Sequence, residues 1–209
     1  MAIDILIFTS TNCTHCASLV DSFRKLQQQN KVGELSVVNI EKHPEQAADY
    51  HVRSVPWFRI GDFEFSGAHN YKELEYWVKI ADTEEGIRQY IIQQLETGQL
   101  KNIEKHFQYH PDWLTISIPI LADMQSPLQA RIGISAIIES MAGNPLLENI
   151  IEPLGKLTVA DDPRVRGDAC HLLGLIKHPD AKNLVRNCLN DSDPEVREIA
   201  EETISDSPF

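Results

Sequence analysis

Residues 3–16 read Ile-Asp-Ile-Leu-Ile-Phe-Thr-Ser-Thr-Asn-Cys-Thr-His-Cys, and this stretch decides the fold of the first third of the chain. Its first six residues form an Ile-rich apolar run, which is typical of a buried β-strand that ends in a polar turn. From Cys13 onward, apolar residues recur every three or four positions, which predicts an amphipathic helix. The apolar positions of this helix are Leu19, Val20, Phe23 and Leu26.

Strand and helix patterns continue to about residue 80. We expect a strand over residues 34–40, a helix over 44–50, strands over 57–60 and 63–66, and a last helix that Asn70 caps and that runs through Lys79. The two short strands flank Gly61-Asp62, which has the length of a hairpin turn. A whole helix separates the first two strands, so these strands must run parallel. The predicted fold is α/β with the order β-α-β-α-β-β-α.

From Asp82 onward the strand patterns disappear, and amphipathic helices alternate with Asp, Pro and Gly breaks. Residues 162–166, Asp-Pro-Arg-Val-Arg, recur 31 positions later as Asp-Pro-Glu-Val-Arg at 193–197, and a weaker copy begins at Ser126. In this pattern Asp caps a helix, Pro occupies its first turn and Val faces the neighbouring repeat. The second part of the chain is therefore predicted to be all-α and repetitive.

The Asp-Pro-x-Val-Arg pattern, with its period near thirty residues, resembles short HEAT-like repeats of the phycobilisome-lyase type. The resemblance implies a solenoid of antiparallel helix pairs over residues 82–209. Divergent helices are expected over 82–120 and clearer repeats over 121–209. Residues 1–81 then form a separate domain.

Two groups of side chains recur in these repeats. Cys170 and Cys188 fall among small and apolar residues, where a free cysteine behaves as a small hydrophobic side chain, so we expect them in the core. A second redox pair would need their Cα atoms within about 7 Å. Arg131, Arg166 and Arg197 follow the repeat period, and we expect them to bond to loop carbonyls or acids inside the stack.

Cys13 and Cys16 are the candidate catalytic residues. They lie at i and i+3 where a strand gives way to a helix, a spacing that can close a disulfide ring. A helix start favours a thiolate, so Cys13 is the candidate nucleophile and Cys16, one turn inside the helix, the resolving thiol. Half of a zinc site has the same spacing, but His15, His43 and His51 do not supply a second ligand pair, so no metal is expected.

Residues 3–81 resemble the thioredoxin superfamily, and within it the minimal glutaredoxin-like or thioredoxin-like disulfide oxidoreductases. The resemblance rests on the strand that leads into the cysteine pair, on residues 41–56 ending in Val-Arg-Ser-Val-Pro, and on Phe-Ser-Gly at 65–67. It implies that the bond before Pro56 is cis and packs beside the cysteines, and that Val55 offers its backbone to a substrate peptide.

The chain departs from the family pattern at several positions. Asn12 replaces a tryptophan that is common before the first cysteine, and Ile7 occupies the strand position of a buried acid. Trp57, directly after the proline, is expected to wall one side of the site. Thr14 and His15 lie between the cysteines and are expected to tune them; the alternative for His15 is an exposed polar side chain.

The net charge of the chain bears on which classes of partner molecule are expected. Of the formal charge of −12, residues 1–81 carry −2 (8 Lys and Arg, 10 Asp and Glu) and residues 82–209 carry −10 (11 and 21). Such an acidic surface repels phosphate backbones and anionic lipids, so neither a nucleic acid nor a membrane is expected as partner. The first residues lack a basic leader, and no apolar stretch approaches ~18 residues, which indicates a cytoplasmic protein.

We therefore predict a thiol-disulfide oxidoreductase that acts on protein substrates without a bound cofactor. Cys13 attacks, Cys16 resolves, and Val55, Pro56 and Trp57 contact the substrate, while the helical repeats select a protein partner. An alternative is an interaction scaffold or redox sensor in which the repeats are the functional half. Glutathione-dependent activity is a third and weaker option, because few basic side chains lie nearby.

Overall fold

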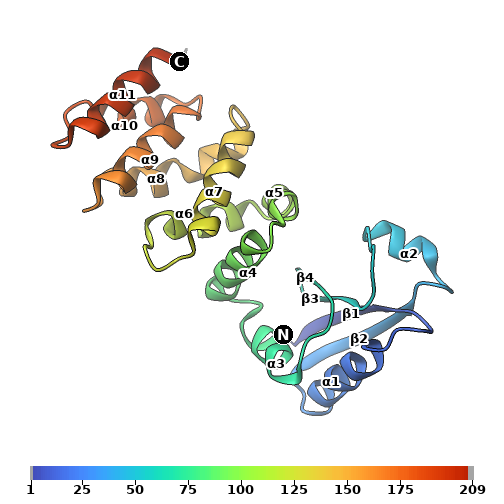
Figure 1. The fold of residues 1–209 in the computed structure, drawn as a ribbon. Coiled ribbons are helices and arrows are strands. Elements are labelled where there is room, and N and C mark those ends of the chain that lie inside the picture. The colour runs from blue at the N-terminus through green and yellow to red at the C-terminus, as the bar shows by residue number, and fades with distance from the viewer. Residues whose placement is uncertain (1, 207–209) are drawn as a thin grey trace. The chain divides into compact units, whose positions relative to one another are not determined.

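The computed structural model describes residues 2–206, which divide into two compact units with the boundary between Ile87 and Arg88. Figure 1 shows a sheet with helices in the first unit and helices in the second. This confirms the predicted fold class, an α/β domain followed by an all-α helical domain.

The first unit has the predicted order of elements. These are β1 (Ile3–Thr9), α1 (Cys16–Gln28), β2 (Val32–Asn39), α2 (Pro44–Asp49), β3 (Trp57–Ile60), β4 (Phe63–Ser66) and α3 (Tyr71–Ile80). The strands lie in the order β2-β1-β3-β4. As predicted, β1 runs parallel to β2, and β3 and β4 form an antiparallel hairpin.

Neighbouring residues of β3 point to opposite faces of the sheet, and each face has its own aromatic cluster. On the α1 face, the ring centroid of Phe58 lies 5.5 Å from that of Phe23 in α1. On the other face, Trp57 packs against Phe8 of β1 and Ala47 of α2. The sheet is therefore covered on both sides, with β1, which leads to the cysteines, at its centre.

Two local predictions in this unit are confirmed at atomic detail. Gly61 in the hairpin turn has a φ of +57°, a conformation that glycine adopts without steric cost. Asn70 caps α3, since its side-chain oxygen accepts hydrogen bonds from the amides of Lys72 and Glu73 at 3.0 and 3.1 Å. The Glu73 carboxylate accepts one from the Asn70 amide in return, which completes a capping box.

The start of α1 differs from the prediction. The helix begins at Cys16 instead of Cys13, and residues 10–15 form turns. The buried stripe of the helix starts with Cys16 and Leu19, whereas the polar residues before it bond elsewhere: Thr11 bonds to Glu41. Cys13 therefore lies on the turn before the helix, and Cys16 occupies the first helical position.

The second part of the chain is helical. Its elements are α4 (Glu84–Glu96), α5 (Leu100–Tyr109), α6 (Pro111–Ala122), α7 (Leu128–Ser140), the 3-10 helix η1 (Pro145–Ile150), α8 (Ile151–Leu157), α9 (Pro163–Gly174), α10 (Pro179–Cys188) and α11 (Pro194–Asp206). Helix α9 packs against α8, α10 and α11. The repeated Val165 and Val196 are buried, as are Ala169 and Ala200 at the same offset.

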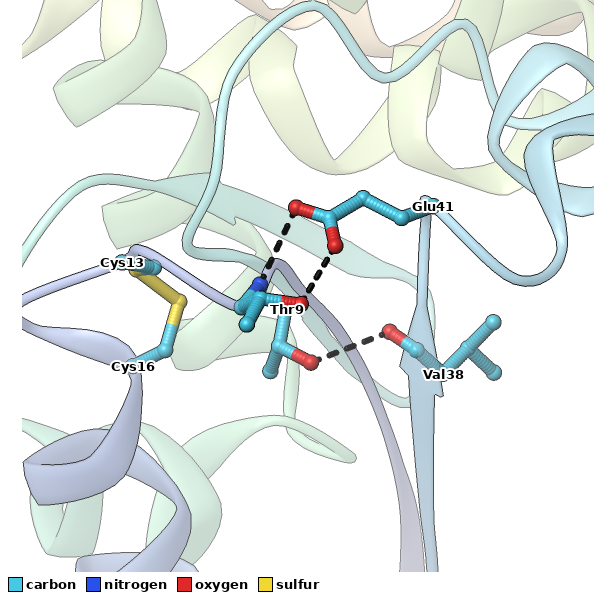
Figure 2. The surroundings of a disulfide bond; sticks show 6 residues. Thr9, Cys13, Cys16, Val38 and Glu41 are labelled. Atoms are coloured by element: carbon cyan, nitrogen blue, oxygen red, sulfur yellow. Dashed lines mark hydrogen bonds between the residues drawn. A yellow bond between two sulfur atoms is a disulfide. The ribbon is translucent and has the colours of Figure 1, made fainter.

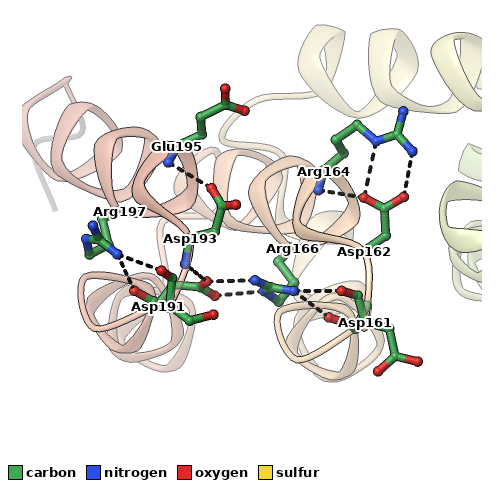
Figure 3. A network of polar contacts seen from close by, with 10 residues as sticks. Asp161, Asp162, Arg164, Arg166, Asp191, Asp193, Glu195 and Arg197 are labelled. Atoms are coloured by element: carbon green, nitrogen blue, oxygen red, sulfur yellow. Dashed lines mark hydrogen bonds and ion pairs between the residues drawn. The ribbon is translucent and has the colours of Figure 1, made fainter.

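Two of the three repeated arginines bond to loop carbonyls, as predicted. Arg166 donates to the carbonyls of Ala160 and Asp161 at 2.9 and 3.0 Å, and Arg197 donates to those of Asp191 and Ser192 at 2.7 and 3.1 Å (Figure 3). Both arginines thus hold the loop before their own helix, one repeat apart.

The prediction for Arg131 was wrong. Its Nη1 lies 3.1 Å from the sulfur of Met124, and its Nε has no hydrogen-bond partner among residues 2–206. Arg131 and Arg166 are each the fourth residue of their helices, α7 and α9. Both side chains therefore reach the loop before their own helix, but the partner of Arg131 in that loop is the Met124 sulfur instead of a backbone carbonyl.

The Asp residues before the repeat prolines cap their helices, as predicted. The Arg164 amide donates to the Asp162 carboxylate, and the Glu195 amide to that of Asp193, both at 2.9 Å. Each aspartate thereby satisfies a backbone donor in the first turn of its helix.

Candidate active site

The two cysteines of the first unit are joined. The Sγ atoms of Cys13 and Cys16 lie 2.03 Å apart in a disulfide, and their Cα atoms are 5.4 Å apart. Figure 2 shows this disulfide where the chain leaves β1 and enters α1. Cys16 is only 4% exposed, while Cys13 is partly exposed on the turn. Of the two residues, Cys13 is the one an incoming thiol or disulfide reaches first.

A hollow of about 280 Å³ opens beside the disulfide. Its lining comes from the end of β1, the first turns of α1 and the edge strand β2: Thr9, Ser10, Thr11, Cys13, Cys16, Ala17, Val20, Asp21, Arg24 and Val37. Arg24 and Asp21 form an exposed ion pair at 3.3 Å. The hollow therefore brings both charges and apolar surface next to the sulfurs.

A residue of the loop after β2 reaches the cysteine turn. The carboxylate of Glu41 accepts hydrogen bonds from the Thr11 amide at 3.2 Å and from the Thr11 hydroxyl (Figure 2). Glu41 is not among the site residues predicted from the sequence. Its position two residues after the end of β2 was the available signal, because parallel strands end at the same edge of a sheet.

The cis-proline loop borders the same end of β1. The Val55–Pro56 bond is cis, which confirms the expectation from the resemblance. Phe8 pairs with Trp57 at the end of the antiparallel β1–β3 ladder, so Pro56, the residue before Trp57, comes at the end of β1 where the cysteine turn begins. The Pro56 carbonyl accepts a hydrogen bond from the Gly67 amide at 2.8 Å, and Val55 is partly buried.

Trp57 lies elsewhere than expected. It is 8% exposed, and its ring packs against Phe8 and Tyr50 with centroid distances of 5.4 and 5.6 Å. These contacts place it on the α2 face of the sheet, whereas the hollow beside the disulfide lies between α1 and β2. The structure thus brings Pro56 to the cysteine end of β1 and turns the Trp57 side chain into the core.

Three more positions that the sequence pointed to lie in the cysteine turn or in β1. Thr14 and His15 are exposed, and His15 is the N-cap residue of α1, directly before Cys16. Ile7 is fully buried, so the strand presents an aliphatic side chain where the resemblance implies an acid.

The other two cysteines are free and buried, as predicted. They lie on the packed helices α9 and α10. A hydrogen bond with Cys188, together with burial, raises the pKa of the Cys170 thiol well above its usual range. The two cysteines therefore lie close together on these neighbouring helices, which the sequence pattern did not predict.

Across residues 2–206, no group of three or more His, Cys, Asp or Glu side chains is arranged to hold a metal ion. None of the helices in that range has the length and apolar character needed to cross a membrane.

Comparison with known proteins agrees with the geometry. Residues 1–79 match the family model of the thioredoxin domain, and residues 136–207 match that of HEAT repeats. A search of curated proteins found no match. The chain thus combines an N-terminal thioredoxin-like domain with C-terminal HEAT repeats.

Proposed function

We propose that this chain is a thiol-disulfide oxidoreductase that acts on protein substrates through Cys13 and Cys16. The observation that carries the proposal is the disulfide between these residues at the end of β1, where the β1–β3 pairing also brings Pro56. A thioredoxin-like domain with a close cysteine pair supports a redox role.

In the proposed reaction, the reduced Cys13 thiolate attacks one sulfur of a substrate disulfide. A Cys13–substrate disulfide forms, the substrate S–S bond breaks, and the other substrate sulfur leaves as a thiolate that takes up a proton. Cys16 then attacks the Cys13 sulfur and releases the second substrate thiol. Two electrons pass to the substrate, the internal disulfide forms, and a second dithiol must reduce it for another cycle.

The environments of the two cysteines support this division of roles. Cys13 is partly exposed on the turn before α1, where unpaired backbone N–H groups of a helix start stabilise a thiolate. Cys16 is 4% exposed and needs to reach only Cys13. In this proposal the exposed Thr14 and His15 tune the thiolate, and His15 stabilises it when protonated.

We assign substrate positioning to the loop before β3. Pro56 directly precedes Trp57, whose pairing with Phe8 ends the β1–β3 ladder at the cysteine end of β1, and the partly buried Val55 comes before it, so an extended substrate chain along this loop would pass close to Cys13. Trp57 supports this loop from the core through its contacts with Phe8 and Tyr50. Its role is therefore to hold the site together, while Val55 contacts the substrate.

The HEAT repeats carry the proposed selection of a protein partner. A hollow of about 240 Å³ is lined by residues of α6, α7 and α9, and Leu128 and Ile132 at this hollow are 57% and 58% exposed. Exposed apolar side chains rimmed by charged groups are typical of protein-interaction sites. Glu139 and Asp168 supply charges at the same place.

The same surface favours a second candidate, an interaction scaffold or redox sensor in which the repeats are the functional half. In that case the cysteine pair would change state without turning over substrates. Both candidates place a partner on the repeats, but only the oxidoreductase predicts a covalent mixed disulfide.

Trapping and redox titration of the 209-residue chain test the proposal. Cys16→Ser, with the resolving thiol removed, should accumulate a disulfide between Cys13 and a disulfide-containing test protein, and Cys13→Ser/Cys16→Ser should trap none. The wild-type pair should equilibrate with glutathione buffers at a potential between about −270 and −120 mV, the range of thioredoxin-type proteins. Failure of both the trap and the equilibration would overturn the oxidoreductase and leave the repeats as the functional half.

A further inference from the structure

The exposed turn that carries Cys13 is fastened to the end of the neighbouring strand. Two donors of Thr11, its amide and its hydroxyl, bond to the two carboxylate oxygens of Glu41, the amide at 3.2 Å. Thr11 lies two residues before Cys13. Within the turn, the Cys13 amide donates to the Ser10 carbonyl at a long 3.4 Å, so Glu41 provides the anchor from outside the turn.

Glu41 is itself held in place by the loop after β2. Its amide donates to the Asn39 side chain at 2.8 Å, and the amides of Lys42 and His43 donate to the Asn39 carbonyl at 3.1 and 3.0 Å. The Ile40 amide bonds to the Thr9 carbonyl at 2.9 Å, which joins this loop to the end of β1. These hydrogen bonds hold the backbone of Glu41 beside the end of β1, and its exposed side chain reaches the cysteine turn from there.

We propose that Glu41 is a positioning residue for disulfide exchange, which holds the turn through Thr11 so that the Cys13 sulfur is presented for attack. The inference rests on the proposed function. An attacking sulfur must approach in line with the Cys13–Cys16 bond, and a turn held in one conformation offers that geometry for a larger fraction of the time. Glu41 touches Thr11 and acts through it.

Charge is the competing explanation for any effect of Glu41. A carboxylate near Cys13 disfavours its thiolate, as does Asp21 from α1, whereas Arg24 and a protonated His15 favour it. Glu41→Gln removes the charge but keeps both hydrogen bonds possible. Its side-chain carbonyl can accept from the Thr11 backbone amide, and its side-chain NH2 group can donate to the Thr11 hydroxyl. Glu41→Ala removes both the charge and the bonds, so the pair of variants separates the two explanations.

The experiment uses the full chain and two small probes. The rate constant for reduction of the oxidised protein by dithiothreitol reports attack on the disulfide. Alkylation of the reduced protein by iodoacetamide as a function of pH separates the pKa of Cys13 from the reactivity of its thiolate. Glu45→Ala, which removes another exposed glutamate of the same region, is the matched control.

Two rate constants are compared at high pH, where the attacking thiol is fully ionised: that for reduction by dithiothreitol and that for alkylation by iodoacetamide. We expect Glu41→Ala to lower both of these limiting values by roughly threefold to tenfold, the effect of losing about one hydrogen bond. Thr11→Val removes the hydroxyl but keeps the hydrogen bond from the backbone amide to Glu41 and the Glu41 charge, so it should lower both rate constants less. Glu41→Gln and Glu45→Ala should retain wild-type values at high pH. Combining Thr11→Val with Glu41→Ala should add nothing to Glu41→Ala alone.

The outcomes distinguish this inference from the function on which it rests. Equal limiting rates for wild type, Glu41→Ala and Thr11→Val would overturn the positioning role. The same would follow if Glu41→Gln matched Glu41→Ala in both rate and pKa, because charge would then explain the effect. If wild-type protein itself formed no reducible Cys13–Cys16 disulfide, the proposed function would fail first.

Discussion

Arg166 and Asp191 join two successive repeats through a bidentate ion pair. The Nε and Nη2 atoms of Arg166 each donate to a different carboxylate oxygen of Asp191 at 2.8 Å, and the two side chains are 12% and 10% exposed (Figure 3). The backbone carbonyl of Asp191 also accepts from Arg197. One aspartate therefore links the arginines of both copies of the repeat.

This ion pair predicts a loss of stability in acid. The hydrogen bonds from Arg166 hold the pKa of Asp191 at about 2, below the ~3.9 of an unfolded aspartate. A lowered pKa stabilises the folded state above pH ~4, and this contribution fades as the pH falls from ~4 towards 2. Asp191→Asn should thus destabilise the repeats by about 2 kcal/mol at pH 7 and by much less near pH 2.

Urea unfolding at both pH values measures this difference. Asp161→Asn is the matched control, because Arg166 bonds to the carbonyl of Asp161, which the substitution keeps. An Asp191→Asn deficit that is equal at pH 7 and pH 2 would contradict the electrostatic account.

The contact between Cys170 and Cys188 predicts a difference in thiol reactivity. Because the hydrogen bond and burial raise the pKa of Cys170, its thiol should resist alkylation in the folded, reduced protein at pH 8. Cys13 should react under the same conditions. Mass spectrometry of iodoacetamide-treated protein checks this, with urea-unfolded protein as the control in which all four cysteines react. Labelling of Cys170 at the rate of Cys13 would show that the α9–α10 contact opens readily.

The capping box at Asn70 predicts a local effect on α3. Asn70→Ala removes the acceptor for two amides at the start of the helix and should cost about 1 kcal/mol. Hydrogen exchange of residues 71–80 should accelerate roughly fivefold, with α1 as the internal reference. Lys72→Ala, which leaves the cap intact, is the control; equal exchange in both variants would rule out a contribution from the cap.

The proposed tuning role of His15 predicts a shift in redox poise. Replacing His15 with Ala removes a group that stabilises the Cys13 thiolate when protonated, so the dithiol becomes a stronger reductant and its potential more negative, by ~30 mV for each tenfold change in equilibrium constant. The pKa of Cys13 should rise in parallel. Equilibration with glutathione measures the shift, and His171→Ala, at an exposed histidine of α9, serves as control. An unchanged potential would support the exposed-polar alternative for His15.

Several local features could be predicted because neighbouring residues in the chain produce them. The hairpin turn at Gly61, the cap at Asn70 and the caps at Asp162 and Asp193 each join groups within a few positions of one another. The parallel pairing of β1 and β2 follows from the helix between them.

Two of the errors, the start of α1 and the position of Trp57, have a common origin in contacts between distant segments. The start of α1 moved to Cys16 because the residues before it form turns, one of which is bonded to Glu41, thirty positions away from Thr11. Trp57 points into the core because its place in the β1–β3 register assigns it to the α2 face. Neither effect can be read from the spacing of residues along the chain.

The amino-acid sequence by itself determined the two-part architecture, the cysteine pair and the repeat signature, because hydrophobic periodicity, turn residues and helix caps act over short distances. Only the tertiary structure decided which side chains meet: Glu41 with Thr11, Arg166 with Asp191, and Cys170 with Cys188. The physical reason is that strand register and helix packing set these contacts, and both depend on how the whole domain buries its apolar surface.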